Sequence, residues 1–217
     1  MAAECAARRT WRRRDARLAS RSTPLDPEPM IDVHVRFFDL DAVAVDPSLL
    51  SASERDRVAR KATPLLRQRQ AASFHCLRCT LGDVLGAAPA SLAFHLADSG
   101  KPALVDAALH FNVSHSGGIG MLAWGSRELG ADVEALIARP TGRLAQRILS
   151  MPELDRWHAL PLTERSDGLT RAWTRKESAL KALGSGLRTA PSSLDIGIDD
   201  GPWSLGAAGR RWEGADW

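Results

Sequence analysis

The chain lacks any long hydrophobic run. Within its 217 residues no stretch approaches the roughly 18 consecutive apolar residues that a membrane-spanning helix needs, so we expect no membrane partner. The hydrophobic fraction of 44% is nevertheless sufficient for a folded core. The length allows one large domain or two small ones.

The main body of the chain also lacks net charge. Residues 1–29 hold seven arginines and four acidic residues, whereas the remainder holds 22 basic and 22 acidic residues. A nucleic-acid-binding domain needs a basic face, so we expect no nucleic-acid partner. The Arg- and Ala-rich start, followed by a Pro-rich stretch, is typical of disorder. We interpret residues 1–29 as a disordered extension, or as an artefact that precedes a natural start at Met30.

Cysteine is scarce. Cys5, Cys76 and Cys79 are odd in number and accompany no secretory signal, which favours a reduced, cytoplasmic protein. Cys76 and Cys79 have the spacing of half a zinc or redox site. A structural zinc ion takes four ligands and no second pair is present, so we interpret the two as buried helical thiols.

Residues 173–187 have the pattern of one helix with a defined end. Apolar residues beginning with Trp173 recur at helical spacing, and Gly184 can supply the left-handed residue that terminates the helix. Glu177 and Lys181 are four residues apart and therefore share a face. By themselves they are better explained as a solvated ion pair on a helix surface.

A pair of carboxylates lies farther upstream. Residues 119–134 read as a hairpin, with an apolar strand followed by a second strand over 129–134. Residues two apart on a strand point to the same side, so Asp132 and Glu134 would lie together and repel each other unless a cation separated them. Alone they could be an acidic edge. With Glu177 nearby, the three would suit a hard cation such as Mg²⁺.

A short polar stretch precedes this hairpin. An alternating run ends in Ser114-His115-Ser116 and a pair of glycines. Such a turn exposes backbone N–H groups and the side chains of Ser114 and His115, which suits an anion. An ordinary hairpin turn explains the same composition.

Three motifs in this order resemble those of the 4′-phosphopantetheinyl transferases. They are Asn-x-Ser-His-Ser at 112–116, Gly-x-Asp-x-Glu at 130–134, and Trp-x-x-Lys-Glu-x-x-x-Lys-x-x-Gly-x-Gly-Leu at 173–187. The length is similar to that of the larger, pseudo-dimeric type, which modifies carrier domains of fatty-acid, polyketide and non-ribosomal peptide synthases. The resemblance extends from Val33 to Ile198.

The resemblance implies an α+β fold of two similar α+β halves in a pseudo-twofold arrangement, with the cofactor cleft between them. The halves would be residues 30–128 and 129–217, the second carrying the metal site. The implied enzyme is a cytoplasmic monomer. It moves phosphopantetheine from coenzyme A to a serine of an apo acyl or peptidyl carrier protein and releases 3′,5′-ADP.

The resemblance also implies roles for individual residues. Mg²⁺ would be held by Asp132, Glu134 and Glu177. Glu177 would be the base for the serine, and Lys181 would neutralise the leaving phosphate, so both would be catalytic. The nucleotide end of coenzyme A would contact Arg78, Lys101 of a Gly-Lys-Pro loop, Ser114 and His115. Lys176 and Lys181 would also bind the cofactor.

Two alternatives remain open from the sequence. A Mg²⁺-dependent phosphohydrolase also needs clustered carboxylates, although it would not need two lysines beside a metal ligand on one helix. A catalytically impaired relative that only binds coenzyme A or a carrier is the other. It is suggested by residues 209–217, which depart from the family and show no strand pattern.

The sequence pattern also predicts the secondary structure of the rest of the chain. We expect strands at 31–38, 92–96, 129–134 and 193–199 and helices at 47–62, 64–85, 141–149, 152–160 and 166–183.

Overall fold

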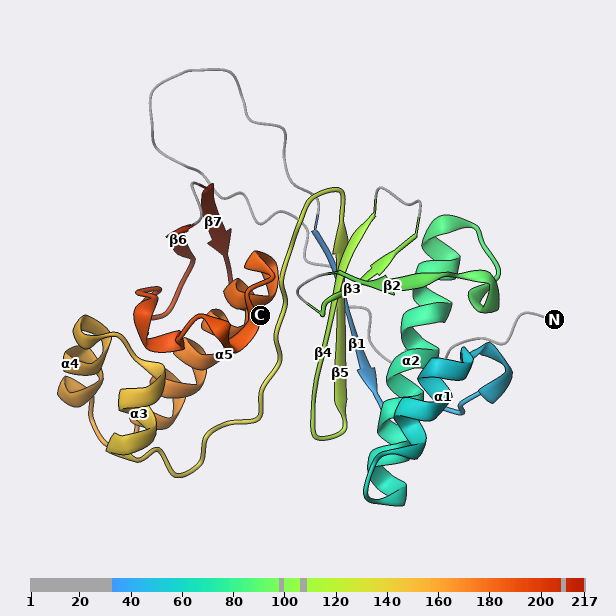
Figure 1. Cartoon of the computed structure of the whole chain (residues 1–217). Helices are drawn as coiled ribbons and strands as arrows, with labels where there is room; N and C mark the ends of the chain where they lie inside the picture. Colours follow the sequence, from blue (N-terminus) through green and yellow to red (C-terminus); the bar gives the residue numbers. More distant parts are fainter. Residues whose placement is uncertain (1–32, 98–99, 106–108, 208–209, 217) are drawn as a thin grey trace.

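The structure is a computed structural model that describes residues 33–97, 100–105, 109–207 and 210–216. It has the mixed α+β character expected from the sequence (Figure 1). The interpretation of residues 1–29 falls outside the described residues. Within the described part of the chain, no helix combines the length and apolarity needed to cross a membrane.

The first part of the chain is built on a three-stranded antiparallel sheet. Strands β1 (Val33–Asp39), β5 (Ile119–Gly125) and β4 (His110–Ser116) pair in that order, and helix α2 (Pro64–Leu85) packs against one face (Figure 1). The Thr63 side chain caps the start of α2 and Gly86 ends it at φ 63°, which matches the expected bounds. The core between sheet and helix contains Phe38, Leu40, Ala72, Cys76, Leu77, Leu81, Phe111, Leu122 and Trp124.

Smaller elements surround this core. The helix expected over 47–62 is divided into the 3₁₀ turn η1 (Pro47–Leu49) and helix α1 (Ala52–Ala59), because Ser51 and Glu54 form a capping box that starts a new helix. A further 3₁₀ turn, η2 (Pro89–Ser91), leads into the two-stranded pair β2 (Phe94–Leu96) and β3 (Pro102–Leu104).

The second part of the chain is mainly helical. Helices α3 (Gly142–Ile148), α4 (Met151–Ala159) and α5 (Arg165–Leu183) share one core, in which Leu169 and Ala172 of α5 are fully buried. Two short turns follow, η3 (Gly186–Arg188) and η4 (Pro191–Ser193). Further along α5, Ala179 and Leu180 belong to a second core with the hairpin β6 (Trp203–Ala207) and β7 (Arg210–Gly214).

The C-terminal expectation was therefore wrong. Residues 210–214 form β7, which pairs with β6, and Trp212 packs against the core that includes Leu180. Asp216 then forms an ion pair with the buried guanidinium of Arg175 on α5. The end of the described chain is thus tied to the same helix that carries Glu177 and Lys181.

Two expected strands do not form. The hairpin in the structure is β4–β5, which turns at Gly117 (φ 56°), rather than 119–134. Residues 129–134 and 194–199 make no strand ladder. Side chains satisfy their backbone groups instead: Asn112 Oδ1 accepts from Ala131 N, and Glu153 Oε1 accepts from Ile196 N.

Residues 129–135, hereafter the acidic segment, pass between the sheet and α5 (Figure 1). Ser116 Oγ accepts a hydrogen bond from Ala135 N at one end, and Lys101 Nζ donates to Leu129 O at the other. The segment therefore carries Asp132 and Glu134 into the space between the two parts of the chain.

Candidate active site

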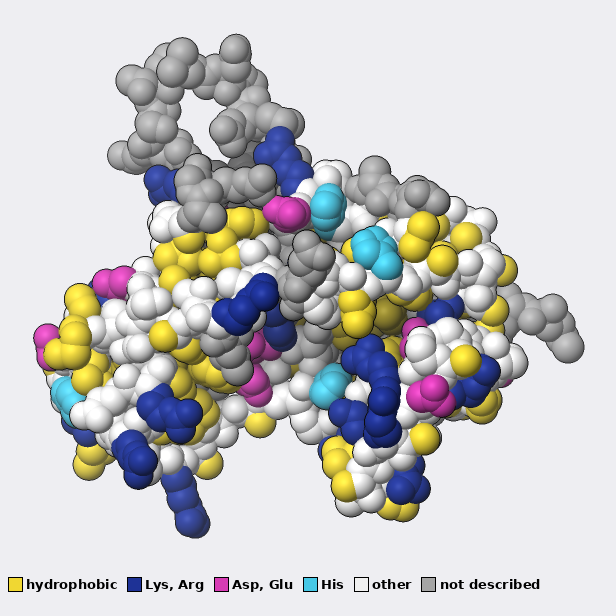
Figure 2. Space-filling view, viewed as in Figure 1, with side chains coloured by type: hydrophobic (Ala, Val, Ile, Leu, Met, Phe, Trp, Pro, Cys, Tyr) yellow, Lys and Arg dark blue, Asp and Glu magenta, His cyan; other side chains and the backbone are white. Residues whose placement is uncertain are grey.

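A cleft of about 310 Å³ lies where β4, the acidic segment and α5 meet. Figure 2 shows acidic side chains at the hollow between the two parts of the molecule, with a histidine and several basic side chains across from them. The cleft contains six of the residues expected from the sequence and two others, and its lining consists of Val113, Ser114, His115, Asp132, Glu134, Trp173, Glu177 and Lys181.

The Asp132 side chain is almost fully enclosed, at 3% exposure. Its Oδ1 accepts hydrogen bonds from Ser114 Oγ at 2.7 Å and from Lys181 Nζ at 2.5 Å. Its Oδ2 is buried and has no hydrogen-bond partner. A buried carboxylate oxygen without a partner is costly, so the position favours a ligand that supplies positive charge.

Glu134 is held from both sides of the cleft. Ser116 Oγ donates to Oε2 at 3.1 Å, and Trp173 Nε1 donates to Oε1 at 3.0 Å. Trp173 was predicted as part of an apolar stripe and of the third motif, without a role in the cleft. Trp173 lies four residues before Glu177 and therefore on the same face of the helix. This spacing could have predicted from the sequence that Trp173 lines the cleft.

Glu177 completes the carboxylate set. Burial is the main factor that raises the pKa of its carboxyl; the charges of Asp132 and Glu134 raise it further, and Lys181 opposes them. The effect of both acidic residues on Glu177 means that the three carboxylates act on one another across the cleft.

The fit of a divalent cation follows from these donors. Among the described residues, no three His, Cys, Asp or Glu side chains are already gathered closely enough to hold a metal ion. Three carboxylates nevertheless line one cleft, and one of their oxygens is buried without a partner. The donor set therefore suits a hard cation with oxygen ligands, such as Mg²⁺.

His115 lies on the sheet side of the cleft. Burial lowers the pKa of its imidazole, and the nearby charges of Lys61 and Lys181 lower it further. Lys61, in the connection between α1 and α2, was not identified from the sequence. Lys181 and His115 line the cleft, and the charge of Lys61 reaches His115, so this side of the cleft favours an anion.

Lys101 is close to the cleft but does not line it. Its Nζ donates to Leu129 O at 2.6 Å. Burial lowers the pKa of its ammonium; the charge of Glu128 opposes this, and the charge of Lys181 lowers the pKa further. In the structure Lys101 anchors the start of the acidic segment.

Arg78 is not brought to the cleft, and its expected contact with the cofactor is corrected here. The side chain is buried within the first part of the chain. Its Nε donates to Glu54 Oε2 at 2.8 Å, and its Nη1 donates to the carbonyls of Pro89 and Leu92 at 2.9 and 3.1 Å. These contacts join α2, α1 and η2, and Arg78 is not among the residues that line the cleft.

The expected contact of Lys176 with the cofactor is also wrong. Its side chain is completely buried, so it cannot contact a cofactor in the cleft. The ammonium is ion-paired with Glu153 and donates to the carbonyls of Ile148 and Leu194, both at 2.8 Å, and of Pro191 at 3.1 Å. Successive helical residues are rotated by about 100°, which places Lys176 on another face from Glu177.

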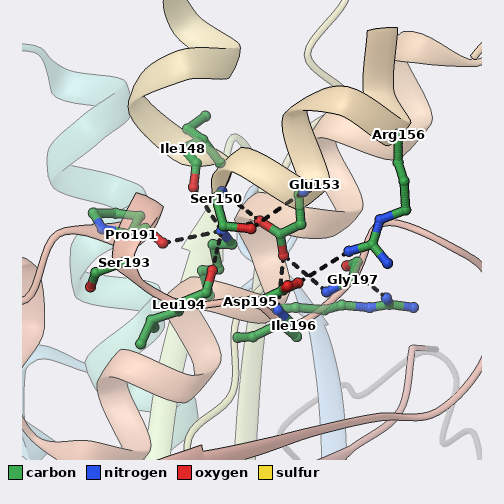
Figure 3. Close-up of polar contacts among 12 residues, drawn as sticks. Ile148, Ser150, Glu153, Arg156, Pro191, Ser193, Leu194, Asp195, Ile196 and Gly197 are labelled. Atoms are coloured by element: carbon green, nitrogen blue, oxygen red, sulfur yellow. Dashed lines mark hydrogen bonds and ion pairs between the residues drawn. The ribbon is translucent and has the colours of Figure 1, made fainter. Parts of the chain in front are cut away.

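Glu153 is the centre of this buried network (Figure 3). Its Oε1 accepts from Ile196 N at 2.8 Å and Gly197 N at 2.9 Å, and its Oε2 accepts from Ser150 N at 2.8 Å. Burial opposes ionisation, but the hydrogen bonds from Lys176 and these amides outweigh it and lower the pKa of the carboxyl. The network joins α4, α5 and residues 191–197.

Comparison with known proteins gives a consistent result. Residues 128–214 match the model of the 4′-phosphopantetheinyl transferase superfamily. The 4′-phosphopantetheinyl transferase HetI of Nostoc sp. is 33% identical over 197 residues, which cover 77% of this chain and 82% of the relative. The transferase Sfp of Bacillus subtilis is 30% identical over 171 residues, covering 72% and 75%. A Synechocystis relative is 33% identical over 145 residues, covering 64% of this chain and 59% of the relative.

Proposed function

This chain belongs to the 4′-phosphopantetheinyl transferase superfamily, a family of transferase enzymes, and we propose that it transfers the 4′-phosphopantetheine group of coenzyme A to a serine of an apo carrier protein. The observation that supports this most strongly is the cleft in which Asp132, Glu134 and Glu177 face Lys181 and His115. It combines ligands for a divalent cation with cations for phosphate in one space.

The proposed reaction is a displacement at phosphorus. The serine oxygen attacks the β-phosphorus of the coenzyme A pyrophosphate, and the bond to the departing 3′,5′-ADP breaks. Such a step depends mainly on positioning and charge neutralisation. Glu177 would accept the serine proton, directly or through water. Its carboxylate lies on α5 in the cleft, four residues before Lys181, where it can reach a hydroxyl group bound in that space.

Asp132, Glu134 and Glu177 would hold Mg²⁺. When bound, the ion would neutralise charge on the pyrophosphate and thereby stabilise the transition state. The partnerless Oδ2 of Asp132 supports this assignment, because a cation would satisfy it. Ser114 and Trp173 would keep the two carboxylates of the acidic segment oriented through their present hydrogen bonds.

The cationic side of the cleft would bind the nucleotide end of coenzyme A. Lys181 would neutralise the departing phosphate, and His115 and Ser114 would contact a phosphate from β4. Lys101 would contribute positive charge from behind the acidic segment, where its ammonium now holds Leu129 O.

The proposal includes a cytoplasmic monomer with an acyl or peptidyl carrier protein as its macromolecular substrate and without nucleic-acid or membrane partners. We divide the enzyme into residues 30–128 and 129–217 as pseudo-twofold halves with the cleft between them. Supporting this division, the lining residues come from both sides of it and the family match starts at residue 128.

The test is incubation of the purified protein with apo carrier proteins, coenzyme A and Mg²⁺, followed by intact-mass measurement. We expect the mass of a phosphopantetheine group to be added, and addition to stop with EDTA. Parallel measurement of released inorganic phosphate tests the phosphohydrolase alternative. Phosphate release without carrier modification would contradict the proposal. Coenzyme A binding without either reaction would favour an impaired relative.

A further inference from the structure

Gly130 packs tightly against the backbone of α5. A Cβ atom at this position would lie 1.9 Å from Ser178 O and 2.4 Å from Ala182 N. Both are backbone atoms of a helix and cannot rotate away. Gly130 has no positive φ, so the absence of space, rather than the backbone conformation, requires glycine here.

The contact between Gly130 and α5 fixes the position of the acidic segment along the helix axis. Ser178 and Ala182 directly follow Glu177 and Lys181 in the sequence, so Gly130 touches α5 immediately beside the residues that enter the cleft. Two residues later, Asp132 accepts from Lys181 Nζ. Gly130 therefore determines how near the acidic segment lies to α5.

Asn112 fixes the opposite side of the segment. Its side chain is buried on β4, and its Oδ1 accepts from Ala131 N at 2.8 Å. The segment makes no strand ladder with β4, so this hydrogen bond and the one from Ala135 N to Ser116 Oγ serve in its place. The backbone next to Asp132 is thus held between β4 and α5.

We propose that Gly130 and Asn112 are positioning residues for the metal carboxylates: together they set the separation between Asp132 and Glu177 across the cleft. This inference rests on the proposed function for its catalytic consequence, but its structural part stands on the contacts alone. Neither residue touches substrate, and both act through the placement of Asp132.

The size of the effect follows from the geometry. A Cβ at residue 130 would have to move by roughly 1 Å to escape the Ser178 carbonyl, carrying the segment away from α5. A misplacement of about 1 Å can reduce a rate by about 10²-fold. Mg²⁺ binding should also be sensitive to a displaced ligand, because the ion requires near-ideal octahedral geometry with ligand distances of about 2.0–2.1 Å.

The experiment compares Gly130→Ala with Gly142→Ala. Gly142, at the start of α3, has no atom within 4 Å of a Cβ built on it, so it matches the substitution without the collision. For Gly130→Ala we expect faster hydrogen exchange of peptides covering residues 129–135. Higher Mg²⁺ concentrations should be needed to raise the melting temperature. The expected fall in kcat is about 10- to 100-fold. KM for coenzyme A should change little, because Ser114 and His115 remain on β4.

Asn112→Leu is the second variant, and it tests the positioning role independently if Gly130→Ala does not fold. Leu is close to Asn in shape but cannot accept from Ala131 N. We expect faster exchange in residues 129–135 and a weaker Mg²⁺ response here as well. Wild-type exchange and Mg²⁺ response in Asn112→Leu would overturn the inference, as would wild-type behaviour of Gly130→Ala.

The two proposals fail in different ways. If the wild-type protein modifies no carrier, the proposed function fails, while hydrogen exchange and the Mg²⁺-dependent melting temperature still test the placement of the acidic segment. If the wild type modifies carriers and either variant matches Gly142→Ala in hydrogen exchange and Mg²⁺ response, the transferase function stands and the positioning role is wrong.

Discussion

Lys181 Nζ lies 2.5 Å from Asp132 Oδ1 and also donates to Ser114 Oγ at 3.0 Å. The ammonium from α5 thus occupies one oxygen of the carboxylate that would bind Mg²⁺, while the other oxygen has no partner. In the proposed reaction the Lys181 ammonium neutralises the departing phosphate. Binding of the cation and the nucleotide should therefore draw the two charges of this ion pair to different partners.

This relationship predicts opposite effects of Lys181→Met on metal binding and on turnover. Without the competing ammonium, Mg²⁺ alone should raise the melting temperature at lower concentrations than in the wild type. Carrier modification should fall by about 10²–10³-fold, the typical loss when one group that stabilises transition-state charge is removed. Thermal melts over a Mg²⁺ series and intact-mass kinetics measure the two effects. Arg143→Met, at an exposed position of α3, is the control. A weaker Mg²⁺ response in Lys181→Met would contradict the account.

Glu177→Gln should stabilise the metal-free protein at neutral pH. Burial and the neighbouring carboxylates raise the folded-state pKa of Glu177 above its ordinary value of 4.5. The stability contributed by this group is complete below the unfolded pKa and is lost as the pH rises through the raised folded pKa. Removing the charge should raise the melting temperature at pH 7, and the difference should shrink towards pH 4. Asp155→Asn, at an exposed carboxyl of α4, is the control. A lower melting temperature for Glu177→Gln at pH 7 without Mg²⁺ would show that the carboxylates do not repel one another.

Lys176→Met should destabilise the fold rather than impair cofactor binding. Removing one member of a fully buried ion pair leaves the Glu153 charge uncompensated and typically costs about 3–5 kcal/mol. Urea denaturation would measure this, with Lys61→Met, outside the buried core, as the control. The double variant Glu153→Gln/Lys176→Met removes both charges and should recover part of the loss. A cost below about 1 kcal/mol for Lys176→Met would mean that the buried network contributes little.

His115→Ala should weaken coenzyme A binding without altering the fold. The loss of a hydrogen bond to a charged phosphate should cost about 1.5–3 kcal/mol by calorimetry. Because the pKa of free His115 is lowered, its cationic form appears only as the pH falls, so wild-type affinity should rise from pH 7.5 to pH 6 more than that of the variant. His95→Ala, at an exposed position of β2, is the control. Equal affinity and equal pH dependence in His115→Ala and the wild type would remove His115 from the cofactor site.

The helices were predictable because their signals are local. The caps of α2, its length and its terminal glycine can all be read from neighbouring residues. The two segments that do not form their expected strands were not predictable, because the partners of their backbone groups are distant side chains. The acidic segment depends on Asn112 and Ser116, and residues 194–199 depend on Glu153 and the basic side chains of α5. Alternation in the sequence cannot distinguish such a segment from a strand.

The site was predicted best where residues share one face of an element. Glu177 and Lys181 enter the cleft together because they are four residues apart on α5. Lys176 and Arg78 were assigned by position within a motif or helix, and both are buried in ion pairs whose partners, Glu153 and Glu54, lie 23 and 24 residues away in the sequence. Gly130 could not be recognised as a spacer because its neighbours on α5 become apparent only in the folded chain.

The most direct test of the central claim is the rate at which Glu177→Gln converts an apo carrier protein to its holo form with coenzyme A and Mg²⁺, measured by intact mass. Glu164→Gln, at an exposed glutamate just before α5, provides the matched control. We predict that the wild type and the control convert the carrier, and that Glu177→Gln, although folded, does not, because a metal ligand and the base are lost together. Conversion by Glu177→Gln at a rate near that of the wild type would contradict the proposed mechanism.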